Sequence, residues 1–141
     1  MPDRFIPFTN LGKGTGLRFD RADIKGLELA LTTIYGREIG YPEFTRPGIF
    51  GSLTSIELFV WRGMKEENEK GELVHTFPLT RKGSEEAGEL VWKYIQDNTG
   101  SADLSKAITD AFIAAGPWFR RNPDAPEEKK TEEKSPKNST T

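Results

Sequence analysis

Few residues in this chain could do chemistry. His75 is the single histidine and there is no cysteine, so these 141 residues cannot form a disulfide, a thiolate zinc site or a cysteine nucleophile. One histidine without a second ligand at metal-binding spacing is typical of a surface or packed residue. We therefore expect no catalytic residue, no metal site and no cofactor.

A glycine-rich segment near the start, LGKGTG at 11–16, is the second candidate, because the backbone N–H groups of such turns can bind phosphate. A P-loop needs GxxxxGK[ST] between a strand and a helix, and a dinucleotide site needs GxGxxG after a strand. Neither order is present. We expect residues 1–16 to form a glycine-rich N-terminal segment with the structure of a loop.

Adjacent carboxylates are the third candidate, and they occur in two groups: Glu66, Glu67 and Glu69, and then Glu85 and Glu86. Two carboxylates do acid and base work when an apolar setting separates their pKa values. Both groups lie in polar runs, which is typical of solvated helix ends. The sequence therefore predicts a protein that is not an enzyme.

Five large apolar side chains are not explained by the helical stripes of the chain: Leu58, Trp61, Trp92, Trp118 and Phe119. Aromatic residues near a surface are enriched at protein–protein interfaces, where one large side chain can anchor a contact. The alternative is that these side chains fill gaps between loops and helices. We treat them as candidate partner-binding residues.

The spacing of apolar residues predicts the elements that would position these side chains. In the most apolar run, LTSIELFVWRGMKE at 53–66, apolar residues recur at three- and four-residue steps, which predicts an amphipathic helix. Its N-cap is Ser52 or Thr54, and Glu57 would complete a capping box with Thr54. Because this helix is apolar on more than one face, it must be buried on two sides or offer part of itself to a partner.

An earlier helix is predicted after Asp20, whose carboxylate is a good N-cap, and Gly36 supplies its C-terminal stop. Gly26 within this helix costs about 1 kcal/mol relative to alanine. Close packing against another helix would offset that cost by using the missing side chain.

Two further helices are predicted after the central one. The first begins after Thr80 or Ser84 and ends near residue 97, and a start at Ser84 would place Glu85 in the first turn, where the helix dipole favours it. The second begins after Ser101 or Asp103 and ends before residue 116, where glycine and proline follow.

The predicted fold class is mainly α: a small helical domain of about four helices at 17–119, with a short extended segment at its start and a disordered polar tail at 120–141. The connection at 37–51 contains proline, glycine and several aromatics. We expect these aromatics to cover the core, with a ligand site as the alternative. The polar run at 65–72 is expected to be a helix end and a turn.

Composition and charge indicate no particular partner. The chain is 35% hydrophobic and 30% charged with a formal net charge of −2, so it has no basic excess that would indicate nucleic-acid binding. The tail at 121–141 carries five basic and five acidic residues, which also argues against a nucleic-acid-binding arm. No signal sequence and no run of about 18 apolar residues is present, so we expect a soluble cytoplasmic protein without a membrane partner.

The order of the segments resembles one known family. A short extended LRFD leads into a helix, and LFVWRGMKEE, PLT, EEAGELVWKYI and DLSKAITDAFIAAG follow. Across 17–116 this order is similar to that of the tail assembly chaperones of long-tailed bacteriophages and related prophages. The closest likeness is the step from Gly63, Met64 and Lys65 to the PLT segment at Pro78.

The resemblance implies a small helical protein, not an enzyme, in the cytoplasm of the bacterial host. It implies binding to the tape measure protein and recruitment of tail tube protein, and also a longer, frameshifted form of the same chain. The alternative is a structural head–tail or tail-completion subunit of the particle.

Overall fold

The computed structural model describes residues 4–116, and their structure is mainly helical, which confirms the predicted fold class. In this range the helices are α1 (Arg21–Tyr35), α2 (Pro47–Phe50), α3 (Leu53–Gly63), α4 (Arg81–Asn98) and α5 (Ala102–Ala115), with 3-10 turns η1 (Thr9–Leu11) and η2 (Tyr41–Glu43). Trp118, Phe119 and the predicted disordered tail at 120–141 lie outside the described residues.

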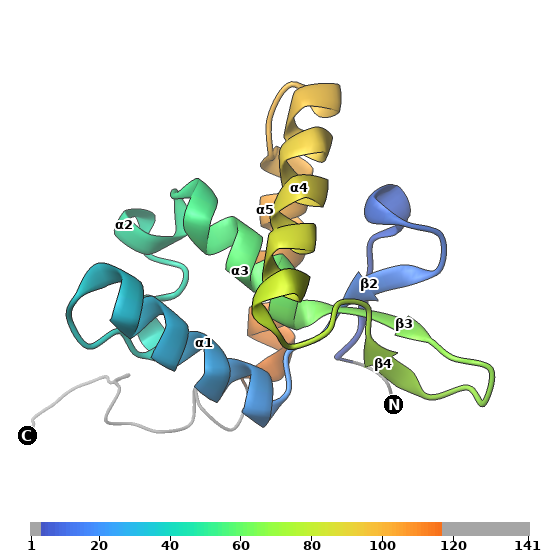
Figure 1. Ribbon diagram of the computed structural model, residues 1–141, viewed down its shortest axis with the longest axis horizontal. Helices are drawn as coiled ribbons and strands as arrows, with labels where there is room; N and C mark the ends of the chain where they lie inside the picture. The colour runs from blue at the N-terminus through green and yellow to red at the C-terminus, as the bar shows by residue number, and fades with distance from the viewer. Residues whose placement is uncertain (1–3, 117–141) are drawn as a thin grey trace, which may run out of the picture.

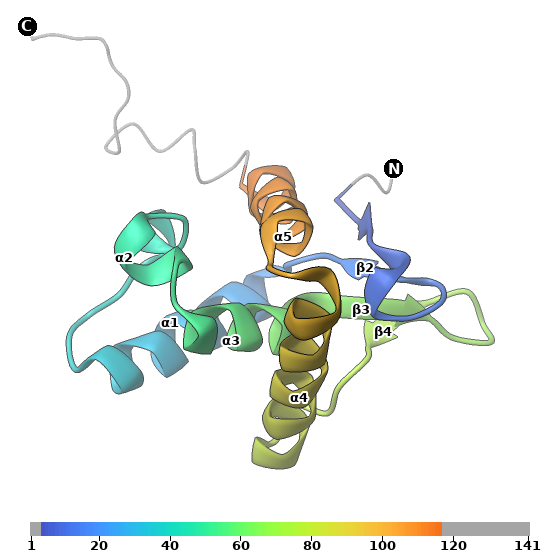
Figure 2. The same cartoon turned by 90° about the horizontal axis from the view of Figure 1, so that it is seen from above.

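A small antiparallel sheet accompanies the helices. Its strands lie side by side in chain order, β1 (Ile6–Pro7), β2 (Thr15–Leu17), β3 (Met64–Glu67) and β4 (Leu73–His75). Three helices separate β2 from β3 in the chain, and Leu17 pairs with Met64 in the ladder. The sheet lies to one side of α4, and α1 and α2 lie to the other, as Figures 1 and 2 both show.

The prediction of a loop throughout 1–16 is wrong at Ile6–Pro7, which is β1, and at residues 15 and 16, which belong to β2. Leu17, the last residue of β2, lies in the short extended segment that was expected at the start of 17–119. Thr15, Gly16 and Leu17 are all buried, because β2 lies between β1 and β3. An alanine Cβ at Gly16 would lie 2.5 Å from the carbonyl oxygen of Ile6. Glycine at this position permits the close approach of two strands, a role unrelated to phosphate binding.

The prediction that the central helix continues to residue 66 is also wrong, since α3 ends at Gly63 and the chain continues as β3. The carbonyl oxygen of Gly63 accepts a hydrogen bond from the Arg18 N–H at 2.9 Å, a contact that ties the helix end to the segment after β2. An alanine Cβ at Gly63 would lie 2.5 Å from the Phe19 ring. Pairing with β2 therefore overrides the helical spacing of the sequence.

The core is built around Phe112 of α5. Its ring lies 4.2 Å from Phe19, 5.0 Å from Phe59 of α3 and 5.5 Å from Phe44, measured between ring centroids. The Tyr41 hydroxyl donates to the backbone oxygen of Phe112 at 2.6 Å. The aromatics of the 37–51 connection thus pack into the core, which confirms the structural interpretation of that segment.

The structure also decides between the alternative helix starts. Ser52 caps α3, because its hydroxyl accepts from the Ser55 N–H at 3.0 Å, and Thr80 caps α4, because its hydroxyl accepts from the Gly83 N–H at 3.1 Å. Ser101 precedes α5. Because α3 begins after Ser52, Glu57 does not form the capping box predicted with Thr54. Because α4 begins after Thr80, Glu85 is not in its first turn.

Gly26 of α1 is used for close packing, as the sequence allowed. The guanidinium of Arg62 lies across it, and an alanine Cβ at this position would be 2.7 Å from Nη1. The same guanidinium donates to the backbone oxygen of Ala22 at 2.9 Å. Because Gly26 has no side chain, the Arg62 guanidinium of α3 can pack directly against the backbone of α1.

Candidate partner-binding site

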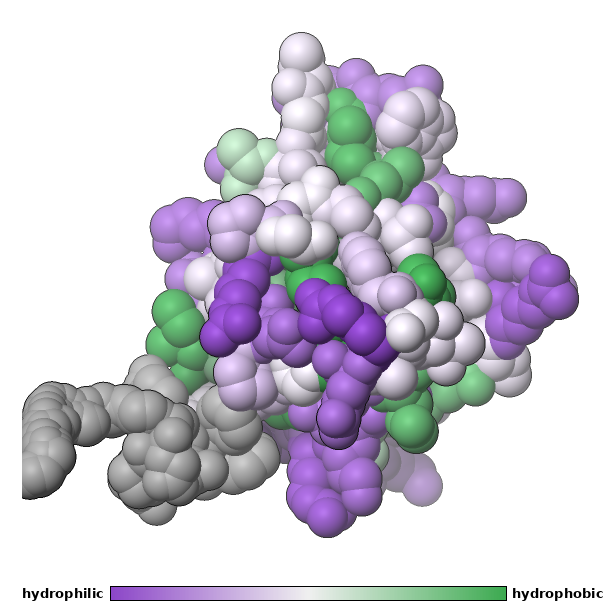
Figure 3. All heavy atoms as spheres, turned by 90° about the vertical axis from the view of Figure 1, so that its left-hand side faces the viewer, coloured by the Kyte–Doolittle hydropathy of each residue, from purple (hydrophilic) through white to green (hydrophobic). Residues whose placement is uncertain are grey.

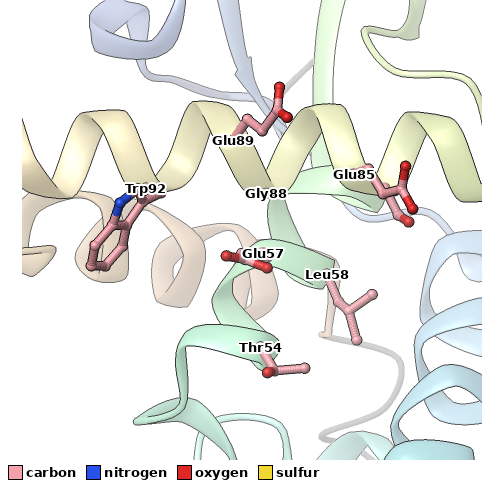
Figure 4. Close-up of a pocket in the computed structure, with 8 residues that line it drawn as sticks. Thr54, Glu57, Leu58, Glu85, Gly88, Glu89 and Trp92 are labelled. Carbon is pink, nitrogen blue, oxygen red and sulfur yellow. The ribbon is translucent and has the colours of Figure 1, made fainter.

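An open groove of about 520 Å³ lies between α3 and α4. It is lined by Thr54, Glu57 and Leu58 from α3, and by Ser84, Glu85, Gly88, Glu89 and Trp92 from α4, as Figure 4 shows. The volume is within the range of about 300 to 1,000 Å³ that is usual for ligand pockets. The groove brings together two of the five candidate partner-binding residues, Leu58 and Trp92.

Small residues bring the two helices close enough to form this groove. Gly88 is buried where α4 crosses α3, and an alanine Cβ there would lie 3.0 Å from Oε1 of Glu57. Ala87 and Val91 of α4 are fully buried beside it. The floor of the groove is therefore a helix crossing with little room for larger side chains.

The apolar part of the groove consists of Leu58 and Trp92. Leu58 is half-buried and packs against the core with one side, while Trp92 remains 50% exposed. Figure 4 shows these two side chains toward opposite ends of the groove, with Glu57 between them. Exposed apolar side chains of this kind are the surface that partner proteins cover.

Glu57 is a half-buried carboxylate in the middle of this groove. Among the described residues it has no hydrogen bond and no ion pair, because Ser52 and not Thr54 caps α3. Burial raises the pKa of Glu57 above its usual value. The groove therefore holds a carboxylate that lacks a cationic partner.

Two further carboxylates lie along α4. Because α4 begins after Thr80, Glu85 is in the second turn and not in the first, and it pairs only with exposed Arg81 at 3.3 Å. Glu89 has no partner among the described residues. None of the residues that line the groove is basic. The sequence singled out Trp92 but did not identify Glu89 as a binding residue, although Glu85, Glu89 and Trp92 follow a visible helical spacing on α4.

Another hollow, beside α1, has a different chemistry. It has a volume of about 340 Å³ and includes Lys25, Glu28 and Leu29 in its lining. Glu28 accepts a hydrogen bond from the Tyr41 N–H at 2.9 Å, so this carboxylate is partnered within the chain. On the face drawn in Figure 3, apolar side chains appear as separate patches among polar ones.

Trp61 does not line the groove. Its indole Nε1 donates to the backbone oxygen of Pro78 at 2.8 Å, and the guanidinium of Arg62 lies 5.6 Å from its ring centroid. Trp61 thus connects α3 to the segment before α4. The positions of Trp118 and Phe119 are outside the described residues.

His75 contacts the buried carboxylate of Asp23 at the junction of α1, α3 and the sheet, while its own side chain is 32% exposed. Its Nε2 lies 2.7 Å from Oδ1 of Asp23, which is 1% exposed. Lys65 Nζ lies 2.9 Å from the other oxygen of this carboxylate, and Arg62 Nε lies 3.3 Å from Oδ1. These side chains form one cluster that joins four elements and explains why a histidine is packed here.

The pKa of Asp23 results from opposing influences. Burial, the largest of them, would raise it, but hydrogen bonds from the Asp20 N–H, His75 and Lys65 and the charge of Lys65 lower it below the ordinary value of 3.8. The carboxylate is therefore ionised and acts as the shared acceptor of this cluster. No spacing in the sequence relates Asp23 to Lys65, 42 positions later, so this cluster could not be predicted from local patterns.

Within 4–116, no group of three or more His, Asp or Glu side chains is placed to hold a metal ion. None of the helices in that range is both long enough and apolar enough to cross a bilayer.

No protein-family model matches the chain, and neither a curated protein nor a solved structure matches it.

Proposed function

We propose that this protein is a tail assembly chaperone of a long-tailed bacteriophage or prophage, acting without enzymatic chemistry in the cytoplasm of the bacterial host. In this role it binds the tape measure protein, keeps the apolar helices of that protein from aggregating, and helps to recruit tail tube protein. The order of segments across 17–116 supports this assignment through its resemblance to the family.

The observation that carries the proposal is the groove between α3 and α4. Leu58 and Trp92 come from different helices, and the apolar stripe of neither helix requires them, yet both line one open hollow. A binding protein needs an exposed apolar contact of this kind, with a polar rim around it. The exposed carboxylates of Glu85 and Glu89 supply that rim, and Glu57 lies between the two apolar side chains.

Co-expression with the tape measure protein encoded in the same gene cluster tests the proposal. The wild-type chain should raise the soluble yield of the tape measure protein, and Leu58→Ser combined with Trp92→Ser should remove most of this effect. The matched control combines Leu29→Ser with Ile113→Ser, because both of these side chains are exposed outside the groove. Equal yields with and without the wild-type chain would refute the chaperone role.

Mass spectrometry of purified particles distinguishes this role from that of a structural head–tail or tail-completion subunit. A chaperone should be absent from the finished particle, whereas a structural subunit should be present at a fixed ratio to the tail proteins. The same co-expression experiment can reveal a longer, frameshifted form of the chain as a second band that copurifies with the tape measure protein.

A further inference from the structure

We infer that the groove between α3 and α4 binds a cationic amphipathic helix. The aliphatic side chains of that helix pack on Leu58 and Trp92, and its Lys or Arg side chains pair with Glu57 and Glu89. This inference rests on the proposed function, because it states the chemistry of the partner segment that the groove takes.

Charge complementarity selects the partner. Three of the lining residues are carboxylates and none is basic, although the chain as a whole has nearly balanced charge. An anionic segment would meet these carboxylates with like charge, which opposes binding, and a neutral one would leave Glu57 unpaired in a half-buried site. A cationic side chain supplies the missing partner.

Glu57 contributes most to the preference for a cationic partner. Its carboxylate lies between the two helices in Figure 4 and has no hydrogen bond or ion pair within the described range. Charge-assisted hydrogen bonds to a partly desolvated carboxylate are stronger than those at an exposed one. A Lys or Arg that reaches Glu57 therefore contributes more than one that reaches only Glu85, which is 63% exposed and already beside Arg81.

The spacing of the lining residues favours a helix as the bound segment. Glu85, Glu89 and Trp92 lie four and three positions apart on α4, so they follow one face over roughly 10 Å. Thr54 and Leu58 have the same four-residue spacing on α3. A partner helix matches such spacing with side chains at three- and four-residue steps. Trp92 can also receive a cationic group over its ring.

A second copy of the chain fits this surface poorly. A twofold contact through the groove would place Glu57 and Glu89 of one copy close to the same residues of the other. Like charges brought together in this way cost free energy and suppress association. The same carboxylates disfavour nucleic acid, whose phosphates are also anionic.

Isothermal titration of the full chain with two synthetic helices tests the inference. Both peptides are about 18 residues long, with the same leucine stripe on an alanine scaffold, and they differ only in carrying lysine or glutamate at the flanking positions. The lysine peptide should bind at least about tenfold more tightly than the glutamate peptide. Its affinity should fall as salt is raised, because screening shortens the reach of charge to about 8 Å at 0.15 M.

Matched variants locate the effect. Glu57→Gln combined with Glu89→Gln should remove most of the preference for the lysine peptide. Glu86→Gln should leave that preference unchanged, since Glu86 is exposed on α4 but does not line the groove. Circular dichroism of each variant confirms that it is folded before titration.

Three results would overturn the inference: no binding of the lysine peptide to the folded chain, equal affinity for both peptides, or a preference that survives in the Glu57→Gln and Glu89→Gln variant. The co-expression experiment is read separately. If the chain raises the yield of the tape measure protein while the peptides show no charge preference, the inference about charge is wrong and the chaperone role stands. If the charge preference holds and the yield does not change, the groove chemistry stands and the chaperone role is wrong.

Discussion

Lys65 Nζ lies 2.9 Å from Oδ2 of Asp23, and both side chains are almost completely buried. The same ammonium donates to the backbone oxygen of Arg18 at 2.6 Å. This ion pair connects β3 to the start of α1. Lys65 lies in the stretch that the sequence alone predicts to be part of the central helix. Its energetic consequences can be measured directly.

Replacing Asp23 with Asn should lower the free energy of unfolding by about 3 to 5 kcal/mol, because it removes the buried carboxylate 2.9 Å from the Lys65 ammonium and leaves only the partly exposed Asp20 carboxylate, at 4.0 Å, as an opposite charge. Urea denaturation at neutral pH measures this change. Asp97→Asn is the control, since Asp97 is 60% exposed and its ion pair with Lys93 is worth about 1 kcal/mol or less. Similar losses in both variants would show that burial of the pair is not the cause.

The stabilisation by Asp23 should also depend on pH. Its pKa is lower in the folded state than the ordinary value of 3.8, so the folded state favours the ionised form. The stabilisation is therefore fully present above pH 3.8 and is lost as the pH falls through the folded pKa. The difference in unfolding free energy between the wild type and Asp23→Asn should be smaller near pH 3 than near pH 5. A difference that grows between about pH 5 and pH 3 would contradict this assignment.

Ser52→Ala should lower the free energy of unfolding by about 1 kcal/mol or more, because its hydroxyl caps α3 and also accepts from the Tyr35 hydroxyl at 3.1 Å. Thr54→Ala should change it by less than about 0.5 kcal/mol, since Thr54 is exposed and is not the cap. Thermal unfolding of both variants checks the choice of cap. A larger loss at Thr54 would mean that the helix begins there.

Trp61→Phe should lower the free energy of unfolding by about 1 kcal/mol, because it removes the hydrogen bond from Nε1 to the oxygen of Pro78 and keeps most of the packing. It should leave the affinity for the lysine peptide unchanged, since Trp61 does not line the groove. Titration and denaturation of the same sample separate the two effects. A loss of affinity without a loss of stability would place Trp61 in the interface after all.

The four long helices of the described range could be predicted from local signals. Asp20 before α1, Gly36 after it and the apolar stripes of α4 and α5 act within one or two turns of the chain, so their effect is visible in the sequence. The core position of the 37–51 aromatics followed from their size and from the small number of other residues able to fill the centre.

The candidate groove could be predicted only in part. Leu58 and Trp92 were identified because no helical stripe accounts for them. Their meeting in one hollow was not predictable, since it depends on how α3 crosses α4 at Gly88. The sequence placed Glu57 in a capping box with Thr54. In the structure Ser52 is the cap, so the Glu57 carboxylate does not cap the helix and lines the groove instead.

By itself, the sequence determined the mainly helical class, the approximate extent of four helices and the absence of cysteine chemistry, because these depend on residue type and local spacing. Only the tertiary structure decided that Met64–Glu67 is a strand and that Lys65 and His75 both contact the buried carboxylate of Asp23. These features depend on contacts between residues about 40 to 50 positions apart, where strand pairing and charge burial outweigh local propensity.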